Sequence, residues 1–170
     1  MSIKTNTLSS IRKKPWNRVD LPVYSLSTSN AAGQHNMHIC TYVSAVSMQP
    51  KRMMVAIYHG TQTLLNATQN PNFVLQLLAH NQYNLVNQLG KQSGKTIDKI
   101  GRLQKRKLLT EWQGYYVLTG ALAVMELHTI AQIEGGDHRL FVADVVSYKN
   151  LNDGEALTTK ILHQKGIIRI

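Results

Sequence analysis

The stretch from Asn36 to Thr63 constrains the fold more than any other part of the chain. Its first part, Met37–Ser47, alternates apolar and polar side chains, as a strand with two different faces does. Pro50 ends this strand, because proline cannot donate to a ladder. The dense apolar run Met53–Tyr58 then has the length of a strand that is buried on both faces. The stretch therefore predicts two strands in succession, separated by a turn.

A small polar loop follows the buried strand. It ends in Thr61-Gln62-Thr63 and opens a predicted helix at Leu64–Gln69, with Pro71 just beyond. The first backbone N–H groups of a helix have no intrahelical partner, and together with two hydroxyls they make a seat for one phosphate. The threonines could also be plain helix caps, and the two roles use the same geometry.

The rest of the chain predicts more strands than helices. We expect strands at Leu21–Ser27, Phe73–Leu78, Ala121–Ile133, His138–Tyr148 and Ile161–Ile170, with short helices from Asn81 to Leu89 and after Thr96. Residues 104–114 are left unassigned. Long antiparallel strands joined by hairpins, with helices clustered in mid-chain, favour a Greek-key-like antiparallel β-barrel over a doubly wound sheet. The predicted class is mainly β with short helices, as one domain over 1–170 with a core at about 20–150 and a basic arm at 1–15.

The charge of the chain favours anionic partners. There are 19 Lys and Arg against 9 Asp and Glu, a formal net charge of +10, which suits phosphorylated cofactors, nucleotides or nucleic acid. Much of it lies in two blocks, Lys4–Arg18 and Lys91–Lys107, and we interpret the second as a solvated loop and helix face. Few aromatic residues interleave with these charges, so a stacking platform for single-stranded nucleic acid is not predicted.

The cysteine count and the hydropathy indicate the cellular compartment of the protein. The single cysteine, Cys40, excludes an internal disulfide and suits a reducing compartment, and we expect a buried structural thiol. His35 and His38 point to opposite faces of a predicted strand, so no metal site is predicted. No run approaches the length of a membrane span, and no hydrophobic signal region follows Met1. We therefore expect a cytoplasmic protein without a membrane partner.

Three blocks in order resemble the flavin reductase-like domain family of split-barrel flavoproteins. The first joins Asn36-Met37 to Ser44–Pro50 and is similar to the family's N-x-M…S-x-x-S-x-x-P-P signature. The second is the strand, loop and helix of Met53–Leu78. The third is Gly135–His138, close to the family's G-D-H hairpin and followed by an apolar strand. The blocks span roughly residues 20–150 with the expected spacing, which makes the resemblance fairly specific.

The resemblance implies FMN, less often FAD, bound without a covalent bond at a homodimer interface. It also implies a role for each matching residue. Asn36, Met37, His38 and Ile39 would line the edge of the isoalloxazine ring, Thr41 and Tyr42 would lie near the ribityl chain or phosphate, Ala56, Ile57 and Tyr58 would flank the ring, Thr61, Gln62 and Thr63 would hold the phosphate, and His138 would sit where the nicotinamide docks.

The sequence is compatible with three functions. The resemblance implies an NAD(P)H-dependent flavin reductase, in which NADH or NADPH gives a hydride to bound flavin and the protein binds and orients both. A second hypothesis is an FMN-binding electron carrier without nicotinamide activity, because His38 and Tyr42 are bulkier than the residues usual in the family. A third, from charge alone, is a nucleic-acid-binding barrel. The electron acceptor, including any partner monooxygenase, is not indicated by the residues.

Overall fold

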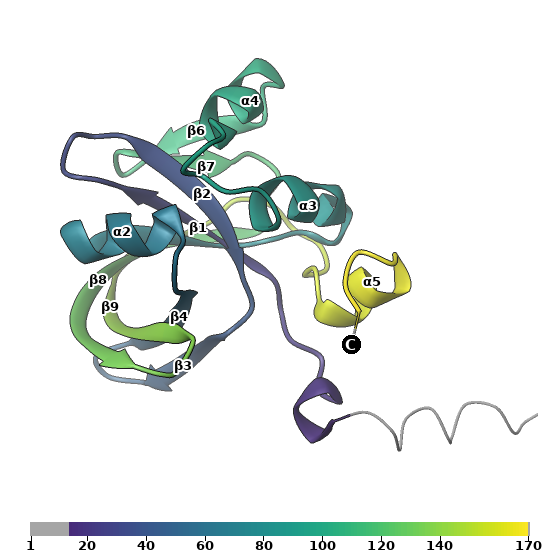
Figure 1. The fold of residues 1–170 in the computed structure, drawn as a ribbon, viewed down its shortest axis with the longest axis horizontal. Helices are drawn as coiled ribbons and strands as arrows, with labels where there is room; N and C mark the ends of the chain where they lie inside the picture. The colour runs from purple at the N-terminus through teal and green to yellow at the C-terminus, as the bar shows by residue number, and fades with distance from the viewer. Residues whose placement is uncertain (1–13, 170) are drawn as a thin grey trace, which may run out of the picture.

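The computed structural model of the protein describes residues 14–169, and strands dominate it. Seven strands form one antiparallel sheet in the order β2-β1-β5-β8-β9-β4-β3, and β6 and β7 form a separate hairpin (Figure 1). The predicted mainly β class is confirmed. The strands are β1 (Tyr24–Ser29), β2 (His35–Cys40), β3 (Val43–Ser47), β4 (Arg52–Tyr58), β5 (Asn72–Leu77), β6 (Leu109–Trp112), β7 (Tyr115–Leu118), β8 (Ala123–Glu134) and β9 (His138–Asn150).

Short helices connect and cover the sheet. They are α2 (Gln62–Gln69), α3 (Leu85–Gly90), α4 (Lys99–Lys105) and α5 (Thr159–Gln164), with 3-10 turns η1 (Pro15–Asn17) and η2 (His80–Asn84). Helix α2 lies beside β1 and β2 on one side, while α3 and α5 lie on the other side of β2 and α4 lies near β6 (Figure 1). No helix in residues 14–169 has the length and apolar character needed to span a bilayer.

The sheet curls into a barrel because its two edge strands are consecutive in the chain. Residues 41–42 carry the chain from β2 at one edge to β3 at the other. The Val43 N–H donates to the Thr41 carbonyl at 3.0 Å, and the Ala56 N–H donates to the Tyr42 carbonyl at 2.9 Å. The prediction of one continuous strand over Met37–Ser47 was therefore wrong, because the backbone turns at Thr41 and each half pairs with a different neighbour.

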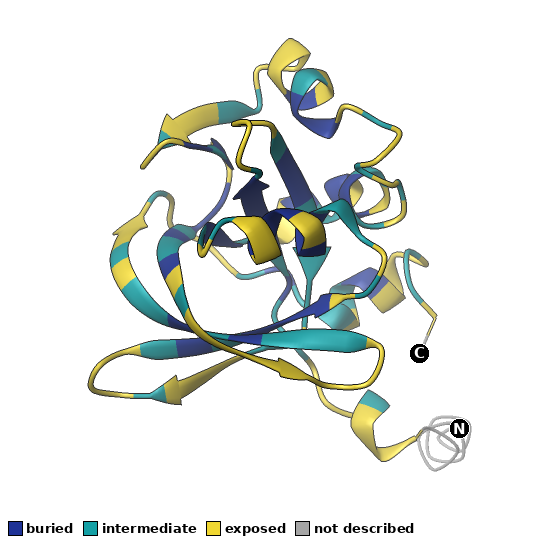
Figure 2. Cartoon of the chain, turned by 60° about the vertical axis from the view of Figure 1, so that its left-hand side comes forward, coloured by how far each residue is buried: buried dark blue, intermediate teal, exposed yellow. Residues whose placement is uncertain are grey.

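The interior of the barrel is an apolar core. Phe73 on β5 and Phe141 on β9 are both 0% exposed and meet edge to face, with ring centroids 6.2 Å apart. Helix α2 closes this core with Leu64 and Ala67. Figure 2 shows these buried positions where α2 meets the sheet, whereas the outer ends of the β3–β4 and β8–β9 hairpins are largely exposed.

A second core joins the barrel to the helical layer. Met37 on β2, Leu89 on α3 and Leu103 on α4 are fully buried within it, and Leu162 of α5 packs there too. The two cores lie on opposite sides of β2, so this strand is the element shared by the barrel and the helices. Three adjoining hollows lie at the surface between the two layers.

Two further expectations needed correction, and the unassigned segment can now be placed. The predicted last strand at Ile161–Ile170 is wrong, because residues 159–164 form α5, and Asp20 Oδ1 accepts from the Lys160 N–H at 2.8 Å as that helix starts. The predicted Thr96 cap is also wrong: Asp98 caps α4 and accepts from the Gly101 N–H. The unassigned residues 104–114 contain β6, which turns back into β7.

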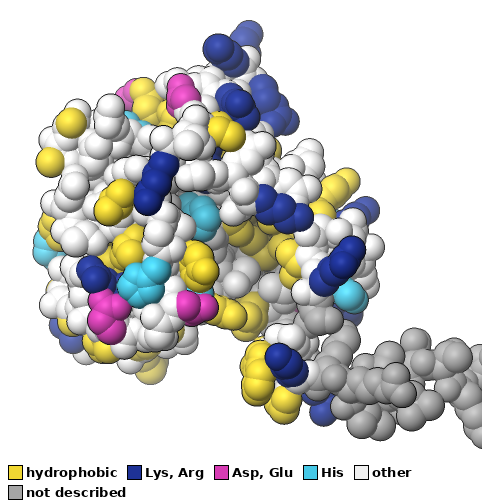
Figure 3. Space-filling view, in the orientation of Figure 1, with side chains coloured by type: hydrophobic (Ala, Val, Ile, Leu, Met, Phe, Trp, Pro, Cys, Tyr) yellow, Lys and Arg dark blue, Asp and Glu magenta, His cyan; other side chains and the backbone are white. Residues whose placement is uncertain are grey.

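The basic segments behave differently from each other. The predicted arm at 1–15 lies outside the described residues except for residues 14–15. In the second block the side chains are solvated, as expected, at Lys91, Lys95, Arg102, Lys105, Arg106 and Lys107, and Figure 3 shows Lys and Arg gathered over α4. For Lys99 the prediction of a solvated face was wrong, since its exposed fraction is only 2%.

The aromatic contact inside the barrel predicts a large loss of stability on truncation. We expect Phe73→Ala to lower the free energy of unfolding by about 3–5 kcal/mol, because the ring leaves a cavity that the closed barrel cannot collapse into. Urea unfolding measures this. Leu65→Ala is the matched control: Leu65 is 46% exposed on α2, and its loss should cost under about 1 kcal/mol. Equal losses in the two variants would contradict this description of the core.

Candidate functional site

Three adjoining hollows lie where β2 and β4 approach α2 and residues 90–98. We call them the apolar hollow (about 270 Å³), the α2 well (about 200 Å³) and the amide cavity (about 560 Å³). The apolar hollow and the α2 well share His38, Tyr58 and Thr63 as walls. The α2 well and the amide cavity share Asn36, Gln62, Gly94 and Lys99. The three therefore adjoin one another in a row.

The apolar hollow sits between two strands that the turn at residues 41–42 brings together. Its lining residues are Leu26, His38, Ile39, Cys40, Thr41, Tyr42, Ala56, Ile57, Tyr58, Thr63 and His138. Cys40, predicted as a buried structural thiol, is a half-buried residue here, and burial of the thiol raises its pKa. The lining combines apolar side chains with the polar groups of His38, Thr63 and His138, and such a combination can hold and orient a flat organic ring.

Three aromatic side chains stand at the mouth of this hollow. The His138 ring lies 5.2 Å from the rings of both Tyr42 and Tyr58, measured between centroids. Tyr58 and His138 are direct partners across β4 and β9, which explains the contact. His138 Nδ1 lies 2.6 Å from Asp137 Oδ1, so the neighbouring carboxylate fixes the orientation of the imidazole.

The α2 well opens at the N-terminus of α2. The Thr61 hydroxyl is the helix cap: it accepts from the Leu64 N–H at 3.2 Å and donates to the Tyr58 carbonyl. The Thr63 hydroxyl is buried and accepts from the Asn36 amide at 2.9 Å. The first-turn N–H groups of Gln62 and Thr63 have no partner inside the helix. Lys91, Ser93 and Gly94 form the facing wall.

A lysine buried without a carboxylate stands between the α2 well and the amide cavity. Lys99 Nζ donates to the Leu89 carbonyl at 2.6 Å and to the Met37 carbonyl at 3.2 Å. Within residues 14–169 no ion pair involves it. Burial lowers the pKa of Lys99 to about 8. Buried charges in proteins are normally paired, so this ammonium lacks the anion that such a group requires.

The neighbouring histidine stays neutral. His38 lines both the apolar hollow and the α2 well, and burial, followed by repulsion from the Lys99 charge, lowers its pKa to about 4. A neutral imidazole at this junction offers one donor and one acceptor without adding charge.

A close backbone contact holds the facing loop in place. A Cβ on Gly94 would clash with Asn36 Oδ1, so any larger residue would have to displace the Asn36 amide for residues 90–98 to approach β2 this closely. Asn36 is thereby fixed between Gly94 and Thr63, and it forms part of the wall between the α2 well and the amide cavity.

Of the residues predicted from sequence, the structure brings nearly all to this row. Ile39, Thr41, Tyr42, Ala56, Ile57, Tyr58 and His138 line the apolar hollow, and Asn36, His38, Thr61, Gln62 and Thr63 line the α2 well. Thr41 and Tyr42, expected near the ribityl chain or phosphate, line the apolar hollow, whereas Thr61 lines the α2 well. The Met37 side chain points into the core and is 0% exposed, and only its carbonyl reaches Lys99.

Sequence reasoning missed the side of the site built by residues 90–99. Lys91, Ser93, Gly94 and Lys99 were interpreted as part of a break and a solvated basic block. A weak signal was present: Lys99 immediately precedes Ile100 and lies four residues before Leu103, on the apolar side of the predicted helix. A lysine so close to an apolar stripe is a candidate for burial.

The fold and the row of hollows are those of a flavin-binding split barrel. Comparison with known proteins agrees with this class. The model of the "flavin reductase like domain" matches residues 16–167. The chain belongs to this family of flavin-binding oxidoreductases, and the predicted split-barrel fold is confirmed.

Individual relatives are distant. The high molecular weight rubredoxin of Moorella thermoacetica is 25% identical over 138 residues, covering 81% of this chain and 59% of that protein, so the chain spans about three fifths of that relative's length. An FMN-binding protein from Thermus thermophilus superposes with a TM-score of 0.70 at 22% identity, covering 88% of this chain and 80% of that one. An NADH:FAD oxidoreductase of Streptomyces globisporus gives 0.72 at 16% identity, covering 82% and 81%.

The buried ammonium predicts an unusual pH dependence of stability. Because the Lys99 pKa falls from an ordinary 10.5 to about 8 on folding, the unfolded chain binds more protons than the folded chain between these pH values. The free energy of unfolding should then rise with pH in this window, on the order of 2 kcal/mol more in the wild type than in Lys99→Met. Urea unfolding of both flavin-free proteins at pH 7.5 to 10 measures the difference, and superimposable pH profiles would contradict a charged, buried Lys99.

Proposed function

We propose that the chain binds the FMN unit shared by FMN and FAD and transfers a hydride to it from NADH or NADPH. The observation that carries the proposal is a ring-sized apolar hollow joined to a well containing a buried, uncompensated cation. A flavin nucleotide has the same two parts, a flat apolar ring and an anionic phosphate. A cytoplasmic location remains the prediction from the single cysteine.

The residues of the apolar hollow fit the isoalloxazine. Ile39 and Cys40 of β2 and Ala56 and Ile57 of β4 are among its lining residues, so the ring would lie beside both strands. The neutral His38 is placed to hydrogen-bond an edge of the ring without a competing charge. The N–H groups of Thr41 and Tyr42 make no backbone hydrogen bond within residues 14–169 and are available for the remaining polar atoms.

The residues of the α2 well fit the phosphate. Gln62 and Thr63, whose first-turn N–H groups have no partner inside the helix, line the well, which lies at the positive end of the helix dipole. An ammonium has three N–H groups, and two of those on Lys99 are used by carbonyls, which leaves one for a phosphate oxygen. The phosphate would supply the anion that Lys99 lacks.

His138, Tyr42 and Tyr58 would bind the nicotinamide of the hydride donor. Bound flavin supplies the hydride chemistry, and the protein's task is to hold the nicotinamide against the open ring face. Tyr42 and Tyr58 are 55% and 51% exposed, so they present flat apolar surface to solvent at the mouth of the hollow. His138, fixed by Asp137, is placed to orient the nicotinamide.

Visible spectroscopy tests this function. The apoprotein should take up FMN, turn yellow, and bleach when NADH or NADPH is added anaerobically. We expect His138→Ala to bind FMN normally and to slow bleaching roughly 10- to 100-fold, because the donor loses its orientation. His163→Ala, which changes an exposed histidine of α5, is the control and should bleach at the wild-type rate.

The electron-carrier hypothesis is decided by the same experiment. Tyr42 and His138 stand together at the mouth of the apolar hollow, which is the observation that favours a blocked nicotinamide site. A protein that binds FMN and is reduced by dithionite, but not by NADH or NADPH, would establish the carrier. A protein that takes up no flavin would refute both functions.

We also propose that the protein is a homodimer. Exposed apolar side chains lie along the outer ends of the sheet: Val46, Met48, Ile130, Ile133, Val146 and Tyr148. Scattered surface apolar residues are normal, but this many on the neighbouring strands β8 and β9 and at the end of β3 favour a covered face. The partner monooxygenase or other electron acceptor is left open by these observations.

Sedimentation should show the protein at twice its monomer mass. Val146→Asp, at a position 60% exposed in the single chain, should shift it to the monomer, because a buried carboxylate without a partner is costly. Leu65→Asp changes a similarly exposed position on α2 and should leave the mass unchanged. A flavin-loaded wild type that sediments as a monomer would contradict the dimer.

A further inference from the structure

The FMN unit accounts for only two of the three connected hollows. The amide cavity, at about 560 Å³, has more than twice the volume of the apolar hollow and falls in the usual range for small-molecule sites. We propose that the flavin is FAD, with its AMP half in the amide cavity and its pyrophosphate beside Lys99. This inference rests on the proposed function and commits it to one cofactor.

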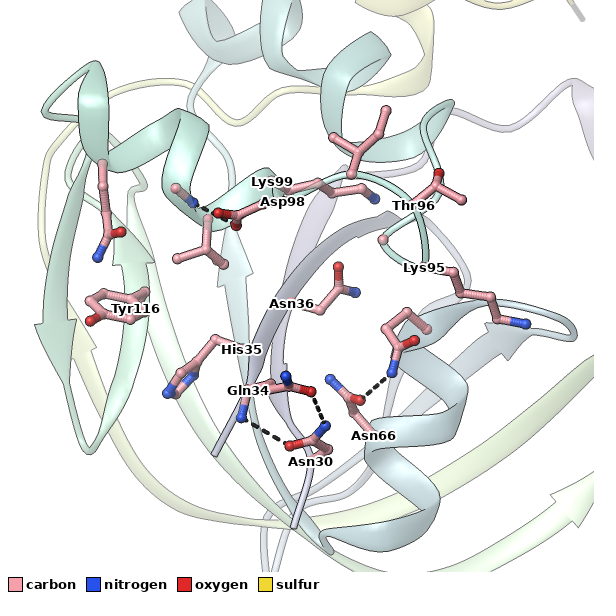
Figure 4. Close-up of a pocket in the computed structure, with 16 residues that line it drawn as sticks. Asn30, Gln34, His35, Asn36, Asn66, Lys95, Thr96, Asp98, Lys99 and Tyr116 are labelled. Carbon is pink, nitrogen blue, oxygen red and sulfur yellow. Dashed lines mark hydrogen bonds between the residues drawn. The ribbon is translucent and has the colours of Figure 1, made fainter. Parts of the chain in front are cut away.

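The order of the hollows matches the order of the parts of FAD. A flavin nucleotide with its ring in the apolar hollow would have its phosphate in the α2 well. The amide cavity begins at the far walls of that well. The shared residues Asn36, Gln62 and Lys99 border both spaces. Figure 4 shows Asn36 in the middle of the close-up, with Lys99 and Lys95 on the loop side and Asn66 on α2. One further phosphate linkage would carry the ligand from the well to the cavity.

Lys99 is placed to serve both phosphates. Its side chain is a wall of the well and of the cavity, and it is 98% buried without a carboxylate partner in residues 14–169. Lys91 borders only the well, whereas Lys95 borders only the cavity. The three lysines thus place positive charge on the well, at the junction and on the cavity. A pyrophosphate needs charge at both ends, whereas a single phosphate needs it in the well alone.

The lining of the amide cavity suits an adenine base. Most of its amide side chains already bond to protein groups, namely those of Asn30, Gln34, Asn36, Gln62 and Asn66. Gln104 is the amide placed to make the paired contact that Asn and Gln make with the N6 and N7 edge of adenine. The Gln104 amide makes no hydrogen bond within residues 14–169. Two rings form the opposite side: His35 and Tyr116 lie with centroids 5.0 Å apart (Figure 4), and a base can stack on such surfaces.

The one acidic group in the lining is compatible with a ribose. Asp98 Oδ1 accepts from the Gly101 N–H at 2.8 Å, so this carboxylate is held at the start of α4. A fixed carboxylate accepts hydrogen bonds from sugar hydroxyls, as acidic residues do in dinucleotide sites. It lies in the amide cavity and not in the α2 well, where it would repel the phosphate.

NADH and NADPH also contain an AMP half, so the AMP unit in the amide cavity could belong to FAD or to the nicotinamide donor. The order of the hollows decides between these two ligands. A nicotinamide stacked at the mouth of the apolar hollow would stand beside Tyr42 and His138, at the end of the row farthest from the amide cavity. The AMP half of FAD begins instead at the flavin phosphate, next to the cavity. The row of hollows therefore favours FAD.

Charge reversal at three exposed lysines tests the proposal. Flavin-free protein is titrated with riboflavin, FMN and FAD, and binding is followed by quenching of flavin fluorescence. We expect FAD to bind at least tenfold more tightly than FMN. Lys95→Glu should raise the Kd for FAD about tenfold and leave the Kd for FMN unchanged, because only FAD reaches the cavity. Lys91→Glu should raise both values, and Lys149→Glu, on the exposed end of β9, should change neither.

The other outcomes are distinct. Equal Kd values for FMN and FAD, or a Lys95→Glu effect on both alike, would overturn the assignment of the cavity while leaving the flavin function intact. If Lys95→Glu instead weakens the binding of NAD⁺ to the FMN-loaded protein, the cavity holds the AMP half of the donor and the proposal is wrong. Failure to bind any of the three flavins would refute the proposed function itself.

Discussion

The ammonium of Lys99 is the interaction on which the site depends. It donates to the carbonyl of Met37 on β2 and to the carbonyl of Leu89 at the end of α3, so one side chain joins the barrel to the helical layer. A charge buried in this way costs free energy, as its lowered pKa shows. An anionic ligand lowers that cost. A protein built around this lysine is therefore less stable when empty, and binding of its ligand stabilises it.

The barrel provides the other requirement, which is a rigid place for the ring. The turn at residues 41–42 takes the chain from one edge of the sheet to the other, and the bond from Ala56 to Tyr42 then holds β2 and β4 side by side. The polar strand face and the buried strand thereby become two walls of one hollow. The same turn closes the sheet and shapes the hollow. Mutations of the barrel core should therefore affect both the stability of the fold and the binding site.

The sequence indicated much of this site in advance. The alternation in β2, the buried strand β4 and the polar loop before α2 are local patterns, and each was recognisable from the residue order. The resemblance placed Asn36, Thr63 and His138 in one site, and all three border the row of hollows. What failed were features with weak local signals: the turn at Thr41, the α5 helix and the β6–β7 hairpin.

Local sequence determined which segments would be strands and which loop would start a helix, because side-chain periodicity and capping act over a few residues. Only the tertiary structure decided that Lys99 is buried, since a lysine among basic neighbours is solvated unless distant elements enclose it. The same holds for Gly94, whose role becomes visible only when Asn36, 58 residues earlier in the chain, is found against it. Burial and close approach are properties of packed pairs, and a one-dimensional pattern does not contain them.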